Sequence, residues 1–157
     1  MLAHGRACYD TSMAAFGILQ SLHRVIDAEP AIRVAYLFGS FARGDSGPTS
    51  DVDVALLAGQ PIDLMDLVAI GARIGIVVDR PVDVVDLRSA PPLLCRQVVA
   101  EGELLLVRDP LLRFDFEHEA VRRCEDTRPL RAQQQQLLRE GLAKMKQWLD
   151  RDSGAAV

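Results

Sequence analysis

The chain has 157 residues, which fits one domain and leaves little room for a second. Its 49% apolar and 25% charged residues are those of an ordinary globular protein, and its net charge of −4 lacks the basic excess of a protein that binds nucleic-acid backbone. Three widely spaced cysteines, no C-x-x-C and no long apolar run argue against a disulfide scaffold, a cysteine zinc site or a membrane span. We expect a cytoplasmic protein, a single domain over 1–157, with no membrane partner and no direct nucleic-acid binding.

Periodic apolar positions, with glycines and prolines between them, predict alternating helices and strands over most of the chain. The expected elements are a helix over 10–30, strands over 33–40 and 51–60, a helix over 61–76, a strand over 80–87, a short helix over 90–102 and a strand over 103–107.

From about Asp109 onward the pattern is helical, and Pro129 is expected to separate two helices or kink one. The predicted fold is therefore an α/β (α+β) domain, a small mixed sheet of about four strands with helices packed on it. We expect a catalytic core at about 33–107 and a C-terminal helical extension at about 109–150.

Two acids follow closely on a turn-rich loop, in the sequence SDVDVALL. On a strand, Asp51 and Asp53 point to one face because side chains alternate with a period of two. Two carboxylates on one face repel each other, and a divalent cation such as Mg²⁺ relieves that repulsion. The pair therefore predicts half of a metal site. A D-x-D pattern alone is a weak signal, and an edge-strand solubility role is the alternative.

A third acid is expected from the strand RPVDVVDL. Asp83 and Asp86 are three residues apart, so at most one of them can join the pair. Asp83 lies between Val82 and Val84, where a charge is costly unless something pairs it, whereas Asp86 is near the strand end and can be solvated. We choose Asp83, with Asp86 as the alternative.

A glycine corner precedes the acids. Gly39 follows a strand and a helix can begin at Ser40, so the turn would present backbone N–H groups and a hydroxyl to a phosphate. Arg43 either contacts phosphate or pairs with Asp45. Facing a metal-binding carboxylate cluster, this corner would suit attack on a nucleoside triphosphate.

Gly39-Ser40, ten residues and then Asp51-x-Asp53 resemble the signature of the polymerase β-like nucleotidyltransferase superfamily, and LFGSFARGD…SDVDVALL with RPVDVVDL resembles its minimal (MNT) members. The resemblance covers about residues 33–107. It implies that Gly39 and Ser40 hold the triphosphate, that Asp51 and Asp53 bind two Mg²⁺ ions, and that Asp83 binds the second and helps deprotonate the acceptor.

The resemblance also implies an antitoxin of a HEPN/MNT toxin–antitoxin system. Such a protein would form a hetero-oligomer with a HEPN ribonuclease toxin and transfer AMP from ATP to a tyrosine hydroxyl of it, a protein adenylyltransferase reaction (AMPylation). Two alternatives stay open. One is a small-molecule nucleotidyltransferase of the aminoglycoside-modifying type, although the chain looks short for an additional substrate domain. The other is an antitoxin that acts by binding alone.

Overall fold

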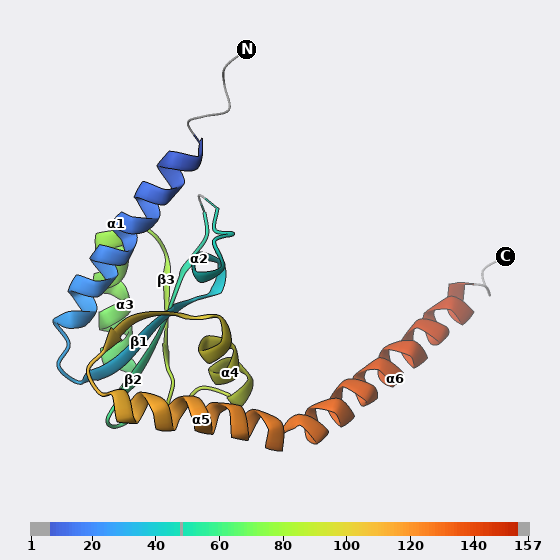
Figure 1. The fold of residues 1–157 in the computed structure, drawn as a ribbon. Coiled ribbons are helices and arrows are strands. Elements are labelled where there is room, and N and C mark those ends of the chain that lie inside the picture. The colour runs from blue at the N-terminus through green and yellow to red at the C-terminus, as the bar shows by residue number, and fades with distance from the viewer. Residues whose placement is uncertain (1–6, 48, 154–157) are drawn as a thin grey trace, which may run out of the picture.

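The structure is a computed structural model, which describes residues 7–47 and 49–153, and the side chains of 17–47 and 49–146. Six helices and four strands alternate along this part of the chain (Figure 1). In order they are α1 (Ala7–Asp27), β1 (Ile32–Phe38), α2 (Gly39–Arg43), β2 (Val52–Ala58), α3 (Leu64–Val78), β3 (Val82–Asp86), α4 (Pro92–Glu101), β4 (Glu103–Val107), α5 (Pro110–Asp126) and α6 (Arg128–Ser153).

The four strands form one mixed sheet, as the sequence predicted, and their order in it is β3-β2-β1-β4. β1 lies in the centre and pairs antiparallel with both β2 and β4. β2 and β3 run parallel, with Val52 opposite Val82 and Leu56 opposite Asp86. β3 and β4 are therefore the two edge strands of the sheet.

Helices cover both faces of the sheet, and each face has its own apolar core. On one face Val52, Val54 and Leu56 of β2 pack with buried residues of α1 and α3. On the other face Ala55 and Leu57 pack with α4 and α5. This alternation fixes which face each residue of β2 occupies, and Asp53 falls on the α4–α5 face.

Most element boundaries lie within a few residues of those expected. α1 starts before position 10. Its periodic apolar positions begin with Met13 and Phe16, whose side chains lie outside the described residues. The strand expected over 33–40 ends at Phe38, because Gly39 and Ser40 already belong to α2.

A proline and a glycine mark two helix boundaries. α5 ends at Asp126 and α6 begins at Arg128, so the chain around Pro129 separates two helices, and α6 leads away from the body (Figure 1). Gly102 is the C-cap of α4 and has a φ of −76°. Glycine is needed there because a Cβ would overlap the carbonyl oxygen of Val98. Within the described residues, none of the helices combines the length and apolarity that crossing a bilayer needs.

Arg108, after β4, ties the end of α1 to the sheet. Its Nη1 atom donates to the carbonyl oxygens of Glu29 (2.6 Å) and Ile32 (3.0 Å), and its Nη2 atom bonds the carboxylate of Asp27 (2.9 Å). A charged donor with several carbonyl acceptors stabilises more than a neutral pair.

Arg108→Ala should therefore lower the free energy of unfolding by about 1–3 kcal/mol, because it leaves carbonyl groups of the α1–β1 connection without their donor. Urea denaturation measures the change. Arg33→Ala, at an exposed position of the neighbouring strand, is the control and should change stability by less than about 0.5 kcal/mol. Equal effects of the two substitutions would contradict this role of Arg108.

Candidate active site

The structure brings Asp53 and Asp83 together on the α4–α5 face of the sheet. Asp53 is directly opposite Asp83 in the parallel β2–β3 pairing. Neighbouring strands lie roughly 4.8 Å apart, so the two carboxylates are side by side. The sequence predicted this pair from two separate strands, and the register is what makes them neighbours.

Asp51 immediately precedes β2 and is exposed. The charges of Asp83 and Asp51 both act on Asp53. Burial of the carboxyl is the largest cause that raises the pKa of Asp53, and the negative charges of Asp83 and Asp51 raise it further. The positive charge of Arg43 lowers this pKa. The three predicted acids therefore share one electrostatic environment.

Gly39 touches this cluster from the end of β1. It has a φ of +71°, which favours glycine, and a Cβ at this position would overlap Oδ2 of Asp53. Phe38, the residue before it, is opposite Asp53 in the β1–β2 pairing. The glycine of the predicted corner is thus required both by its backbone angle and by the space that Asp53 occupies.

Ser40 and Arg43 both lie on the five-residue helix α2, which begins at Gly39 and has Phe38 as its N-cap. Ser40 is thus inside the helix and does not cap it. The Arg43 side chain pairs with Asp45 (Nε–Oδ2 3.3 Å) and Glu101 (Nη1–Oε2 3.6 Å), and all three are well exposed. Its predicted pairing with Asp45 is present, and exposed pairs of this kind are weak enough to exchange for another anion.

Arg80, just before β3, holds the loop that connects α2 with β2, and sequence reasoning missed it. Its Nη1 atom donates to the carbonyl oxygens of Gly47 (3.1 Å) and Ser50 (3.4 Å). Its guanidinium also lies over the Phe41 ring, 5.4 Å from the centroid. These contacts hold the loop segment that leads to Asp51. No local sequence pattern predicts them, because the bonded residues are about thirty positions apart in the chain.

Asp86, the alternative third acid, is not solvated as expected. It is only 3% exposed, and its carboxylate accepts hydrogen bonds from the Arg88 amide (3.0 Å) and the Ser89 hydroxyl (3.2 Å). These bonds close the turn after β3. The geometry therefore supports Asp83 as the neighbour of Asp53 and gives Asp86 a structural role.

The donor chemistry of the cluster suits a divalent cation. Among the described residues, no three His, Cys, Asp or Glu side chains converge as a ready-made metal group. Nevertheless Asp51, Asp53 and Asp83 supply the hard oxygen ligands that Mg²⁺ prefers, and their mutual repulsion, seen at Asp53, is what a cation removes.

Comparison with protein families identifies the fold. The family described as Polymerase beta, Nucleotidyltransferase matches residues 20–111, more than half of the chain. The chain belongs to this family.

Relatives of this nucleotidyltransferase include named protein adenylyltransferases. MntA, a protein adenylyltransferase of Shewanella oneidensis, is 39% identical over 79 residues, which cover 50% of this chain and 57% of the relative. The chain thus spans a little over half of that relative's length. A putative protein adenylyltransferase of Methanocaldococcus jannaschii is 34% identical over 71 residues, 45% of this chain and 76% of the relative.

Solved structures extend the similarity over most of the fold. A crystal structure of a toxin–antitoxin with AMP-PNP contains a chain with a TM-score of 0.65 and 30% identity, covering 79% of this chain and 98% of that one. A structure of tri-AMPylated Shewanella oneidensis HEPN toxin in complex with MNT antitoxin gives a TM-score of 0.59 at 26% identity, covering 84% of this chain and 98% of that one.

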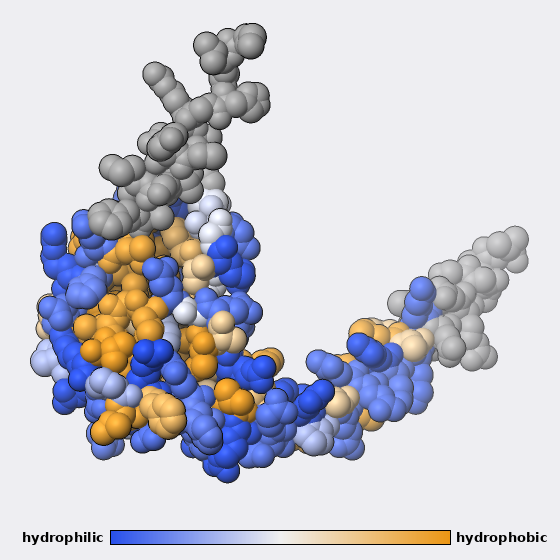
Figure 2. Space-filling view, viewed as in Figure 1, coloured by the Kyte–Doolittle hydropathy of each residue, from blue (hydrophilic) through white to orange (hydrophobic). Residues whose placement is uncertain are grey.

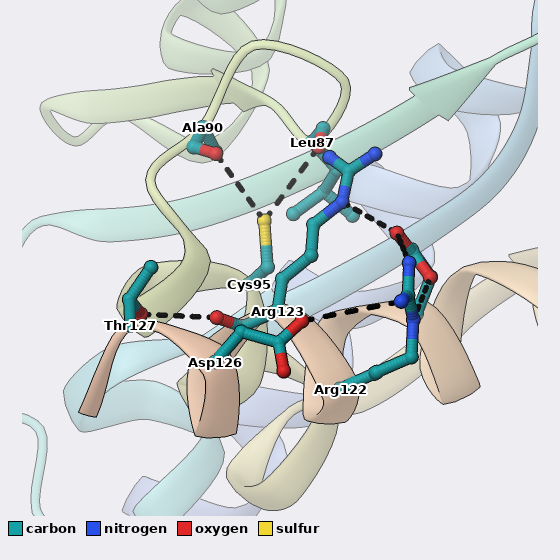
Figure 3. Close-up of polar contacts among 8 residues, drawn as sticks. Leu87, Ala90, Cys95, Arg122, Arg123, Asp126 and Thr127 are labelled. Carbon is teal, nitrogen blue, oxygen red and sulfur yellow. Dashed lines mark hydrogen bonds and ion pairs between the residues drawn. The ribbon is translucent and has the colours of Figure 1, made fainter. Parts of the chain in front are cut away.

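A cavity of about 440 Å³ lies between α4 and α5, near the end of β2 away from Asp53. Cys95 lines it, and its Sγ atom donates to the carbonyl oxygens of Leu87 and Ala90 (3.6 Å each; Figure 3). Burial raises the pKa of this thiol, so it stays protonated at neutral pH and is a poor nucleophile.

The arginines beside this cavity are paired within their own helix. Arg122 and Arg123 both bond Glu119, at 2.8 Å and 2.7 Å, and these bonds lower the pKa of that carboxyl to about 2. Arg122 also approaches Asp126 (Figure 3). The charges of Arg122 and Arg123 are thus balanced by neighbouring acids.

Gly39→Ala should lower stability more than Gly44→Ala, measured by urea denaturation. Both glycines have positive φ (71° and 74°), so both substitutions strain the backbone by about 1 kcal/mol. Only at Gly39 would the new methyl group displace a side chain, since nothing lies within 4 Å of a Cβ on Gly44. Equal losses at the two positions would mean that Asp53 moves aside without cost.

Asp53→Asn should raise the melting temperature in EDTA at pH 7–8 by about 2 °C or more. The raised pKa of Asp53 means that its ionised form costs stability in the folded state. This cost develops as the pH rises from the unfolded to the folded pKa, so the advantage of the variant should vanish below about pH 4. Asp45→Asn, at an exposed position, is the control, and a lower melting temperature for Asp53→Asn would contradict the repulsion.

Proposed function

We propose that this chain is a protein adenylyltransferase that transfers AMP from ATP to a hydroxyl group of a partner protein, and so acts as the antitoxin of a HEPN toxin. The single observation that supports it most is the opposition of Asp53 and Asp83 on parallel strands, with Asp51 and Gly39 beside them. The names of the relatives and the toxin–antitoxin structures support the acceptor class.

In the proposed reaction, the acceptor oxygen attacks the α-phosphorus of ATP. The new bond joins that oxygen to phosphorus, the bond to the β-phosphate oxygen breaks, and pyrophosphate leaves with its electron pair. Asp83, next to Asp53, accepts the proton of the attacking hydroxyl. A tyrosine is the proposed acceptor, as the resemblance to MNT proteins implies.

The proposed roles of the other residues follow their positions. Asp51, Asp53 and Asp83 hold two Mg²⁺ ions, which, when bound, neutralise the charge that develops on the phosphates. Gly39 and the Ser40 hydroxyl hold the triphosphate, and Arg43 exchanges its exposed acidic partners for a phosphate oxygen. We place the reaction in the cytoplasm, where ATP is available, and the free thiols of the buried Cys95 and Cys124 suit a reducing compartment.

Label transfer tests the proposal. The protein is incubated with Mg²⁺ and α-labelled ATP, with and without the protein encoded by the adjacent gene. Wild-type protein should label that neighbour, and Asp53→Asn should reduce the rate by at least about a hundredfold because it removes a carboxylate at the phosphates. Asp45→Asn, outside the cluster, should keep the wild-type rate.

Other outcomes separate the alternatives. A tight complex with the neighbour and full neutralisation of it by a protein lacking all three acids would indicate an antitoxin that acts by binding alone. Label on an aminoglycoside in place of a protein would indicate a small-molecule nucleotidyltransferase. Unchanged labelling by Asp53→Asn would overturn the assignment of the site.

A further inference from the structure

Of the three acids in the candidate site, Asp51 is the one that the sheet does not hold. Asp53 and Asp83 are fixed opposite each other by the β2–β3 pairing, whereas Asp51 precedes Val52, the first paired residue of β2. The position of Asp51 therefore depends on the loop that connects α2 with β2. A carboxylate that shares a metal ion with other ligands needs partners that orient it.

Apolar packing does not hold this loop. Residues 44–51 read GDSGPTSD, and none of those that the structure describes is buried. In the view of Figure 2, the surface where Figure 1 places α2 and the following loop is mostly hydrophilic, whereas apolar side chains gather over the part of the body that includes α1 and α3. Polar contacts must therefore fix the conformation of the loop.

The loop closes into a turn just before Asp51, and Arg80 binds this turn. The Gly47 amide donates to the Ser50 hydroxyl (2.7 Å), and the Ser50 amide donates to the Gly47 carbonyl (3.2 Å). The Arg80 guanidinium donates to the carbonyl oxygens of both residues. It thereby ties the two ends of the turn to the segment that precedes β3.

Main-chain contacts with this segment lie on both sides of Asp51. Before it, the Ser50 carbonyl accepts the bond from Arg80. After it, the Val52 amide donates to the Pro81 carbonyl (2.9 Å). The backbone of Asp51 is therefore held between two bonds to consecutive residues, and the side chain of Arg80 supplies one of them.

The same guanidinium also reaches α2. It lies over the ring of Phe41, which directly follows Ser40 in that helix. Arginine can do both because its planar group donates within its plane and stacks on an aromatic ring with its face. One side chain thus joins the helix that carries Ser40, the loop that leads to Asp51 and the strand that carries Asp83.

We propose that Arg80 is a positioning residue, which holds Asp51 where it can share a divalent cation with Asp53 and Asp83. This inference rests on the proposed function and names a residue outside the acids on which the affinity for the cation depends. Arg80 acts through the loop, so its effect on the cation passes through the position of Asp51.

The direction of the effect separates positioning from charge. By Coulomb's law alone, removal of a positive charge near carboxylates strengthens the binding of a cation. If Arg80 acts by holding Asp51, its removal weakens that binding instead. Partners that orient metal-ligating residues commonly contribute about ten- to a hundredfold to metal affinity.

Arg80→Ala is compared with a matched control at the opposite end of β3. The Nε atom of Arg88 donates to the carbonyl oxygen of Ala58 (2.7 Å), so Arg88→Ala also removes a bond from an arginine to a main-chain carbonyl beside β2. Arg80→Lys is the conservative variant. It keeps the positive charge but lacks the planar fork that reaches two carbonyl groups and lies on the ring.

The measured quantity is the affinity for Mn²⁺, which accepts the same oxygen ligands as Mg²⁺. The full chain is titrated with Mn²⁺ by electron paramagnetic resonance, together with an ATP analogue that has a methylene group between the α- and β-phosphorus atoms. Arg80→Ala should weaken Mn²⁺ binding about tenfold, Arg80→Lys should also weaken it, and Arg88→Ala should stay within about twofold of wild type.

A double-mutant cycle with Asp51→Asn tests the path of the effect. In the Asp51→Asn background, Arg80→Ala should change the Mn²⁺ affinity by less than about twofold, because the carboxylate that Arg80 positions is gone. A general loss of structure would weaken binding by the same factor in both backgrounds. In label transfer, the Mg²⁺ concentration that gives half the maximal rate should rise by the same factor for Arg80→Ala, and saturating Mg²⁺ should restore the rate.

Several results would overturn the inference. These are unchanged or tighter Mn²⁺ binding by Arg80→Ala, equal losses in Arg80→Ala and Arg88→Ala, and full additivity with Asp51→Asn. If Arg80→Ala does not fold, the same criteria apply to Arg80→Lys.

The proposed function is judged separately, by label on the protein encoded by the adjacent gene. Weaker Mn²⁺ binding by Arg80→Ala, without label transfer by wild type, supports the role of Arg80 and contradicts the protein adenylyltransferase. Label transfer by wild type, with Mn²⁺ binding that is insensitive to Arg80, contradicts only the role of Arg80.

Discussion

The parallel register of β2 and β3 places the carboxylates of Asp53 and Asp83 next to each other. The arrangement of the site depends on how the fold keeps these two negative charges together. Asp53 and Asp83 would separate if either strand could slip, but a slip of one residue would move the valines of the slipping strand to the wrong face. The apolar core beneath α1 and α3 therefore holds the carboxylates together. The repulsion that results is stored in the folded protein, which makes the cluster receptive to a cation.

Much of this could be predicted from the sequence because it depends on local patterns. The period-two alternation around Asp53, the glycines that close apolar runs and the prolines at helix starts gave the order of the strands and helices along the chain. Alternation also showed that only one of Asp83 and Asp86 can join the pair. Asp83 was then chosen because a charge between two valines is costly unless something pairs it. The structure agrees that only Asp83 is beside Asp53.

Features that depend on distant segments could not be predicted in this way. The order β3-β2-β1-β4, which makes Asp53 and Asp83 neighbours, is a property of the whole sheet. The contacts of Arg80 with Gly47 and Ser50 join the loop before β3 to the loop before β2. The burial of Asp86 depends on the turn that follows it. The close approach of α3 to β3, which Gly71 and Gly75 permit, likewise depends on how the helix packs against the sheet.

The arm formed by α6 divides the chain into parts of unequal local stability. Arg131 bonds the carbonyl oxygen of Cys124 (2.9 Å) and secures the first turn of α6, whereas Leu138, Leu142 and Met145 further along are well exposed. A helix that buries so little gains little from tertiary packing, which supplies most of the stability of helices in proteins. In the protein alone, α6 should therefore exchange its amide hydrogens by local opening long before the sheet does. The degree of order in α6 thus depends more on what packs against it than on the stability of the nucleotidyltransferase body.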